Sequence, residues 1–238
     1  MSSPYSFRVA LQLPASEDEP FNDWADTQNE IQNEPLTSSV NKVYTPLTLE
    51  EWHDAQLNKA IKAIEDGFDE RAVEILEAIL IKMPNAVDVR ENLASLYLSF
   101  GDYARTTRIV SEGLKYSPAD AALITIKARL LLDQGKAEEA IKLLSGFRPA
   151  LSSYPDFYGT LAAALQSEGR VMEAGSLYKA LIQVDPDNGQ YWLGYGISLE
   201  HNHKLNQAIE AYTKAIQNPD SDPSVRNYAE NHLKTLQG

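Results

Sequence analysis

The stretch that decides the fold runs from residue 190 to residue 215 and reads QYWLGYGISLEHNHKLNQAIEAYTKA. Trp192 and Tyr195 place bulky rings in its first half, while Gly196 and Ala208 supply small side chains. We expect two antiparallel helices, because the bulky residues can fill the gap between them and the small residues let the backbones approach closely. One such hairpin cannot bury its own apolar face, so the stretch predicts stacking on further copies of itself.

Copies of this hairpin recur upstream in steps of 34 residues. From His203 the steps reach Gly169, Gly135, Gly101 and Gly67. Each glycine falls where a first helix must turn into a second, and glycine suits the left-handed end of a helix. The same steps from Gly196 and from Ala208 reach small residues, namely Ala162, Ala128, Ala94 and Ala60, and Ala174, Ala140, Thr106 and Ala72. Five repeats in one register predict an all-α solenoid.

The repeats resemble those of the tetratricopeptide repeat (TPR) family, whose pattern is W-x2-L-G-x2-Y followed by A-x3-F. Trp192 and Gly196 stand at the matching positions. Tyr195 replaces the leucine before the glycine, and Leu199 replaces the tyrosine that ends this part of the pattern. Ala208 and Tyr212 follow in the second half. The resemblance implies a right-handed superhelical solenoid of about five helix-turn-helix repeats, closed by a C-terminal capping helix.

The sequence divides into three segments. Residues 1–47 form an acidic arm that contains prolines, residues 48–222 hold the five repeats, and residues 223–238 form the capping helix. Thr48 and Glu51 have the spacing of a capping box, which predicts the start of the first repeat. Its two helices are expected at about 49–66 and 69–83. The third repeat is irregular, since Gly146 and Pro149 interrupt its second helix and predict a longer loop before the fourth repeat.

The arm differs in composition from the repeats. Over residues 1–50 it carries two cationic side chains against eight acidic ones, and it shows no helical period. Low hydrophobicity with excess charge predicts a largely irregular, flexible tail. Phe21 and Trp24 lie three residues apart and would share one face of a helix, so docking of the arm onto the solenoid or a partner is the alternative.

Composition excludes several partners and leaves the compartment open. The net charge of −13 argues against nucleic acid or an anionic membrane as the main partner. The chain has no cysteine, no apolar run that approaches the ~20 residues of a membrane span, and no signal-peptide core. As written, it is expected to be cytoplasmic and not to insert into a membrane. A periplasmic location is the alternative, if the chain is a truncated form of a membrane-anchored protein.

Motifs for chemistry are lacking. The sequence contains no phosphate-binding loop, no nucleophile elbow and no metalloprotease motif. His201 and His203 are two residues apart at a helix turn, where they do not face one another, so we interpret them as turn residues and not as metal ligands. We therefore expect a protein that is not an enzyme, with no catalytic residues, cofactor or metal site.

Function is then expected on the concave surface formed by the first helices. The TPR resemblance implies that fixed positions of each repeat line this groove. They are Leu57, Ile61, Asp88, Glu91, Asn92, Ser95, Thr125, Arg129, Asp156, Thr160, Leu193, Ile197 and Glu200. Apolar residues lie towards the two ends and acidic residues at the rim, which predicts a protein or peptide partner that is amphipathic and net basic. The basic clamp for a terminal carboxylate is missing, because the groove offers Arg129 alone among cations.

A narrower resemblance lies near the C-terminus. The run PDNGQYWLGYGISLE (186–200) resembles the repeats of the TPR proteins that serve biogenesis of mannose-sensitive-haemagglutinin type IV pili. It implies a scaffold that binds a partner segment during assembly of a bacterial envelope machine. The alternative is a cytosolic adaptor or secreted effector that recruits a regulatory or host protein.

Overall fold

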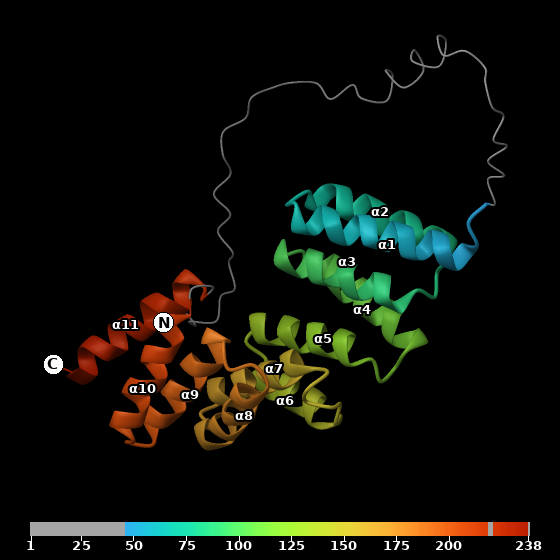
Figure 1. Cartoon of the computed structure of the whole chain (residues 1–238). Helices are drawn as coiled ribbons and strands as arrows, with labels where there is room; N and C mark the ends of the chain where they lie inside the picture. The colour runs from blue at the N-terminus through green and yellow to red at the C-terminus, as the bar shows by residue number, and fades with distance from the viewer. Residues whose placement is uncertain (1–45, 219–220, 238) are drawn as a thin grey trace, which may run out of the picture.

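The computed structural model describes residues 46–218 and 221–237, and these contain eleven α-helices (Figure 1). The helices are α1 (Leu49–Glu65), α2 (Asp69–Lys82), α3 (Val87–Ser99), α4 (Tyr103–Tyr116), α5 (Ala121–Asp133), α6 (Ala137–Ser145), α7 (Pro155–Ser167), α8 (Val171–Val184), α9 (Gly189–His201), α10 (Leu205–Gln217) and α11 (Pro223–Gln237). The expectations for the arm, including Phe21 and Trp24, lie outside the described residues.

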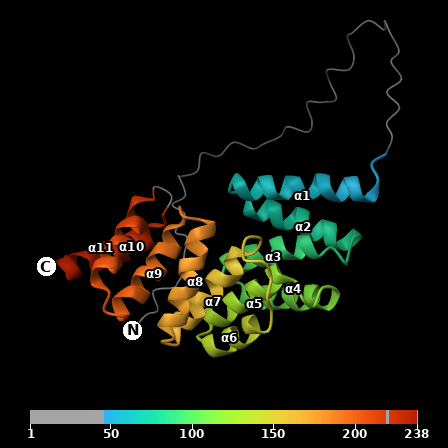
Figure 2. The same cartoon turned by 60° about the horizontal axis from the view of Figure 1, so that its bottom comes forward.

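Successive helices pack in pairs, and the pairs stack one after another into a curved array (Figures 1 and 2). The all-α TPR-like solenoid expected from the sequence is confirmed. The first helices of repeats two to five also contact one another in turn, α3 with α5, α5 with α7 and α7 with α9. The first helices of repeats two to five therefore form one continuous side of the solenoid, and this side carries the candidate site.

Local signals in the sequence set the helix boundaries. Gly67, Gly101, Gly135 and Gly169 have φ between 71° and 78°, the left-handed conformation expected at the turns, and His203 takes the same place with φ 57°. Thr48 closes a capping box, because its hydroxyl accepts from the Glu51 backbone N–H at 3.2 Å while the Glu51 carboxylate accepts from the Thr48 N–H at 2.8 Å. The first hairpin thus spans 49–65 and 69–82, within one residue of the prediction.

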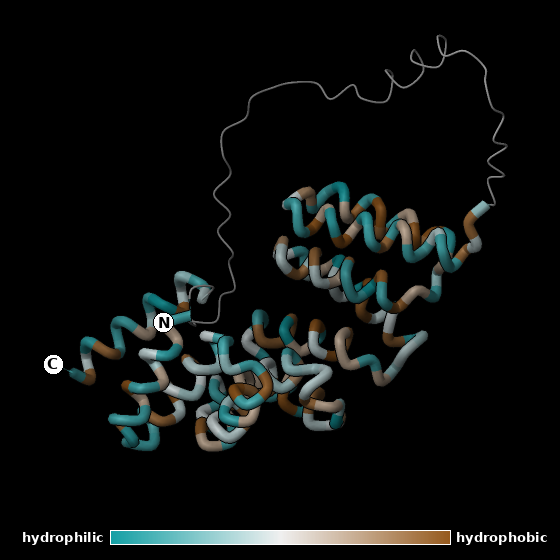
Figure 3. The backbone as a smooth tube through the Cα atoms, viewed as in Figure 1, coloured by the Kyte–Doolittle hydropathy of each residue, from teal (hydrophilic) through white to brown (hydrophobic). Residues whose placement is uncertain are grey.

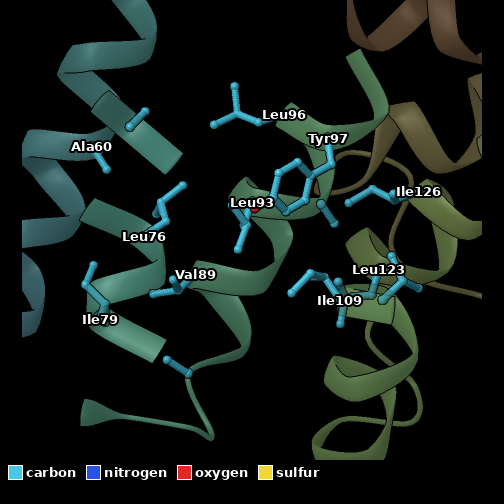
Figure 4. Close-up of a cluster of buried hydrophobic side chains, with 14 of the residues drawn as sticks. Ala60, Leu76, Ile79, Val89, Leu93, Leu96, Tyr97, Ile109, Leu123 and Ile126 are labelled. Atoms are coloured by element: carbon cyan, nitrogen blue, oxygen red, sulfur yellow. The ribbon is translucent and has the colours of Figure 1, made fainter. Parts of the chain in front are cut away.

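Apolar and polar residues are interspersed along the helices (Figure 3), and the buried apolar ones form clusters that span successive repeats. In the N-terminal half, Leu93 and Tyr97 of α3 lie between Leu76 of α2 and Ile126 of α5, and the first three side chains are fully buried (Figure 4). Side chains from three successive repeats thus share one apolar cluster. Each hairpin gains its buried surface from its neighbours, as a solenoid requires.

Small residues allow the closest helix crossings. A Cβ atom added at Gly196 would lie 2.7 Å from the Tyr212 ring, so the absence of a side chain lets α9 pack directly against that ring. Gly194 faces the Tyr178 ring of α8 even more closely. The crossing role expected for Gly196 is confirmed, and Ala208 on α10 is fully buried.

The third repeat departs from the others in its second helix. Helix α6 has 9 residues, whereas α2, α4 and α8 each have 14. The chain after α6 forms a loop over 146–154, and the Tyr158 hydroxyl on α7 fixes it by donating to the Pro149 carbonyl at 2.6 Å. Gly135 and Gly169 remain 34 residues apart, so the loop replaces helix without changing the length of the repeat.

Candidate partner-binding groove

A cavity of about 390 Å³ opens on the side formed by the first helices, where α3, α5 and the start of α7 meet. It is lined by Glu91, Asn92, Ser95, Ala122, Thr125, Ile126, Arg129, Ser153, Tyr154, Pro155, Asp156 and Phe157. Six residues that the sequence assigned to the groove are among them: Glu91, Asn92, Ser95, Thr125, Arg129 and Asp156. We call this space the central cavity.

Helical periodicity places these side chains together. Ala122, Ile126 and Arg129 are spaced four and three residues apart on α5, and residues at this spacing share one face of a helix. The opposite face carries Ile124, which is buried in the solenoid. Asp120 caps the helix by accepting from the Leu123 backbone N–H at 2.9 Å, which brings an additional carboxylate close to the cavity.

The third wall comes from the irregular loop. Ser153, Tyr154 and Pro155 line the cavity, and Pro155 is the first residue of α7, where proline costs no hydrogen bond. The Tyr154 side chain is large and 43% exposed. The sequence predicted a long loop here but did not assign these residues to the groove. The available signal was the interruption of the period by Gly146 and Pro149, which marks where the backbone can leave the helical path.

The central cavity is rich in carboxylates. Burial, the neighbouring Asp120 charge, a hydrogen bond with Asp120 and the Asp88 charge together raise the pKa of Glu91 from 4.5 to about 7. The cation of the lining, Arg129, lies with Nη2 3.4 Å from Oδ2 of Asp156. Both side chains of this pair are substantially exposed, so the pair contributes little to stability and can be rearranged by a ligand.

Several polar donors of the predicted groove are already used within their own helices. The Asn92 amide donates to the Asp88 carbonyl at 2.9 Å, and the Thr125 hydroxyl donates to the Ala121 carbonyl at 2.6 Å. Thr160 donates in the same way to the Asp156 carbonyl at 2.7 Å and is buried. The oxygens of these side chains retain acceptor capacity. The cavity therefore presents acceptors more than donors, which favours a ligand group that donates hydrogen bonds.

Residues that the sequence assigned to the N-terminal end of the groove lie on α1 and at the start of α3. Leu57 is half-buried against the N-terminal core, whereas Ile61 is 36% exposed. Asp88 lies with Oδ2 3.2 Å from Nε2 of His53, which joins α3 to α1. The structure does not bring these residues to the central cavity. They form a separate, partly apolar section of the same side.

At the C-terminal end, Leu193 and Ile197 are half-buried against the cluster that includes Val225 and Ala229 of α11. Glu200 accepts from the Tyr212 hydroxyl at 2.6 Å and lies 2.9 Å from Nδ1 of His232. Its carboxylate therefore joins α9 to α10 and α11 and is engaged within the solenoid. Sequence spacing alone could not show this, because it depends on how α11 packs.

Within residues 46–218 and 221–237, no three acidic or histidine side chains are grouped so that they could hold a metal ion. No helix in that part of the chain has both the length and the apolar character needed to cross a membrane.

Comparison with known proteins finds a family model that matches the C-terminal repeats. A sequence model of the tetratricopeptide repeat matches residues 160–223, which cover the fourth and fifth repeats almost completely. No curated protein is significantly similar in sequence to the chain.

Solved structures with the same fold share little sequence with it. Pseudomonas aeruginosa pilF has 14% identity and a TM-score of 0.66, over 79% of this chain and 90% of that one. A thermophilic TPR protein of Thermus thermophilus has 15% identity and a TM-score of 0.61, over 76% and 99%. MamA from Desulfovibrio magneticus has 17% identity and a TM-score of 0.55, over 74% and 99%. At these identities the likeness shows the fold alone.

Proposed function

We propose that this TPR repeat protein is a non-enzymatic scaffold that holds an amphipathic, net-basic segment of a partner protein along its first helices. The observation that carries the proposal is the central cavity, which joins three consecutive first helices and exposes carboxylates beside apolar walls. TPR solenoids act through protein partners bound on such extended surfaces. An acidic, acceptor-rich cavity complements a partner that brings cationic donors.

Apolar residues to either side of the cavity extend the surface. Ile61 is exposed on α1, and Ile197 is half-buried on α9. A segment that spans several repeats would place apolar anchors near these residues and its charges near the cavity. Anchors contribute most of the affinity, and complementary charges contribute mainly to specificity and association rate.

A peptide array tests this function. The full chain is applied to peptides of varied charge and amphipathicity, and we expect enrichment of basic amphipathic sequences, with binding that weakens as salt rises. Glu91→Lys should weaken binding, whereas Glu139→Lys on the exposed outer side of α6 is the matched control and should retain it. Enrichment of acidic peptides or of free C-terminal carboxylates would contradict the proposal.

The finer proposal is a role in assembly of a bacterial envelope machine such as a type IV pilus. The resemblance of residues 186–200 to pilus-biogenesis TPR proteins supports it, and a solved pilF structure shares the fold. Fractionation of cells that produce the full-length protein tests it. A pool that co-purifies with the envelope favours the scaffold, whereas a wholly cytosolic protein favours the alternative of an adaptor or effector. Crosslinking followed by identification of the bound protein then names the partner.

A further inference from the structure

The third repeat is irregular where it borders the central cavity. Helix α6 has 9 residues where α2 has 14, and the loop that follows it ends at Ser153 and Tyr154, which line the cavity beside Pro155 at the start of α7. A volume of about 390 Å³ lies at the lower end of the range for pockets that take small molecules, so it fits a side chain and not a helix.

Two kinds of side chain line this space. Ala122, Ile126 and Phe157 supply apolar walls, and Tyr154 adds an aromatic ring at the loop. Glu91 and Asp156 supply carboxylates. A long side chain with an apolar stem and a cationic tip matches both surfaces at once, because the stem can lie along the walls while the tip reaches a carboxylate.

We infer that the central cavity receives one lysine or arginine side chain of the bound segment, with Glu91 as the carboxylate that recognises its charge. This inference rests on the proposed function and adds to it the group that enters the cavity. Glu91 is the better acceptor of the two carboxylates, since its neighbours Asp120 and Asp88 are acidic, whereas Asp156 already faces the cation Arg129. The chain's own arm is a poor source of the side chain, because residues 1–50 contain two cations and eight acids.

Charges around Glu91 favour a cation from outside. Asp88 lies on its own helix and is next to His53 of α1, Asp120 caps α5, and Asp156 begins α7. Arg129 of α5 is the cation that lines the cavity, and it contacts Asp156. Burial raises the pKa of Glu91, and the Asp120 and Asp88 charges add to this shift. A bound cation stabilises the carboxylate and therefore lowers the pKa of Glu91.

The test uses a double-mutant cycle between peptide and protein. The probe is a 15-residue amphipathic peptide of leucine and lysine, with each lysine replaced in turn by norleucine, which keeps the stem and removes the charge. We expect one lysine to dominate, with its replacement weakening binding at least tenfold to the parent protein and less than about twofold to Glu91→Gln. The control variant Glu139→Gln makes the same charge change outside the cavity and should retain the tenfold effect.

A second probe is independent of the groove as a whole. Nα-acetyl-lysine methylamide, titrated into the labelled full chain, should shift the backbone amide resonances of Ala122 and Ile126, and the norleucine analogue should not. The arginine analogue compares the two cations. Glu91→Gln should abolish the shifts, and Glu139→Gln should preserve them.

The outcomes separate this inference from the proposed function. Peptides that bind with all lysines contributing equally, or with a dominant lysine that is unaffected by Glu91→Gln, would overturn the inference and leave the scaffold function intact. Failure of all basic peptides would count against the proposed function, and the diamide titration would still decide the inference. If neither the lysine nor the arginine diamide shifts the amide resonances of Ala122 and Ile126, the inference that the central cavity receives a cationic side chain is refuted.

Discussion

The Nδ1 atom of His232 on α11 lies 2.9 Å from Oε2 of Glu200 on α9, and this contact ties the last helix to the repeat before it. The same carboxylate accepts from the Tyr212 hydroxyl on α10 at 2.6 Å. The His232 ring also stacks on Tyr228 with centroids 4.4 Å apart. Three helices therefore meet at one carboxylate, and α11 is held by a specific contact in addition to its apolar face.

Replacement of Glu200 should loosen the last helix. Glu200→Ala removes the acceptor of the Tyr212 hydroxyl, which belongs to a buried side chain, and we expect a loss of about 1–3 kcal/mol in unfolding free energy. Hydrogen exchange should accelerate in α11 before the rest of the chain. Glu210→Ala, on the exposed side of α10, is the control and should leave both measurements unchanged. Unaltered exchange in α11 of the Glu200 variant would contradict the role given to this contact.

Removal of residues 223–238 should convert the end of the solenoid into an aggregation site. The deletion uncovers the apolar face that Val225 and Ala229 of α11 bury against Leu199 and the end of the fifth repeat. Exposed contiguous apolar surface promotes association. Light scattering after size-exclusion chromatography should show higher oligomers for the truncated chain and not for the full chain at the same concentration. A monodisperse truncated protein would argue against a capping role.

A charge at the helix crossing of repeat five should be severely destabilising. Ala208 is fully buried, so Ala208→Glu places a carboxylate in an apolar crossing at a cost of about 3 kcal/mol or more. Gln207→Glu makes an acidic substitution at the adjacent exposed position and should melt within ~2 °C of the parent. Equal melting temperatures for both variants, measured by circular dichroism, would refute the packing described for α10.

Two glycines should respond differently to a methyl group. Gly135 has φ 72° and open space around its Cβ position, so Gly135→Ala should cost about 1–2 kcal/mol from backbone strain alone. Gly194 lies against the Tyr178 ring, so Gly194→Ala should cost more through overpacking, despite the better helix propensity of alanine. Gly135→Asn tests the cause, because asparagine tolerates this conformation and should recover part of the loss. A larger loss of stability for Gly135→Ala than for Gly194→Ala would contradict the close packing of Gly194 against the Tyr178 ring.

Stability should depend on pH through Glu91. Because its pKa rises from 4.5 to about 7 on folding, the folded chain binds more protons than the unfolded chain between these values. This contribution is present below pH 4.5 and is lost as pH rises through 7. Glu91→Gln should therefore raise the melting temperature by about 2–4 °C at pH 8, the equivalent of about 1 kcal/mol, and by less at pH 5. Glu139→Gln should show no such difference between the two pH values.

Most of the fold could be predicted because its determinants are local and repeated. The turn glycines need a left-handed backbone, and Thr48 with Glu51 forms its capping box within one turn, so helix boundaries followed from short-range rules. Glu91 of α3 and Arg129 of α5, which the TPR resemblance places on the groove, line the same cavity.

The rest of the site depends on contacts between elements distant in sequence. Tyr154 reaches the central cavity through a loop without periodicity, so no spacing rule places it. The raised pKa of Glu91 depends on Asp120, which lies 29 positions further along the chain and belongs to the next first helix. Glu200 points into the solenoid because it contacts His232, and this contact depends on how α11 packs against α9.

In the third repeat, α6 ends early and a loop follows it, while the length of the repeat stays at 34 residues. The hairpins after the loop therefore keep the same repeat register as those before it, and the irregular segment is confined to one junction of an otherwise regular array. Changes at Ser153 and Tyr154, which end this loop and line the central cavity, would therefore alter one wall of the cavity without shifting the register of any other repeat.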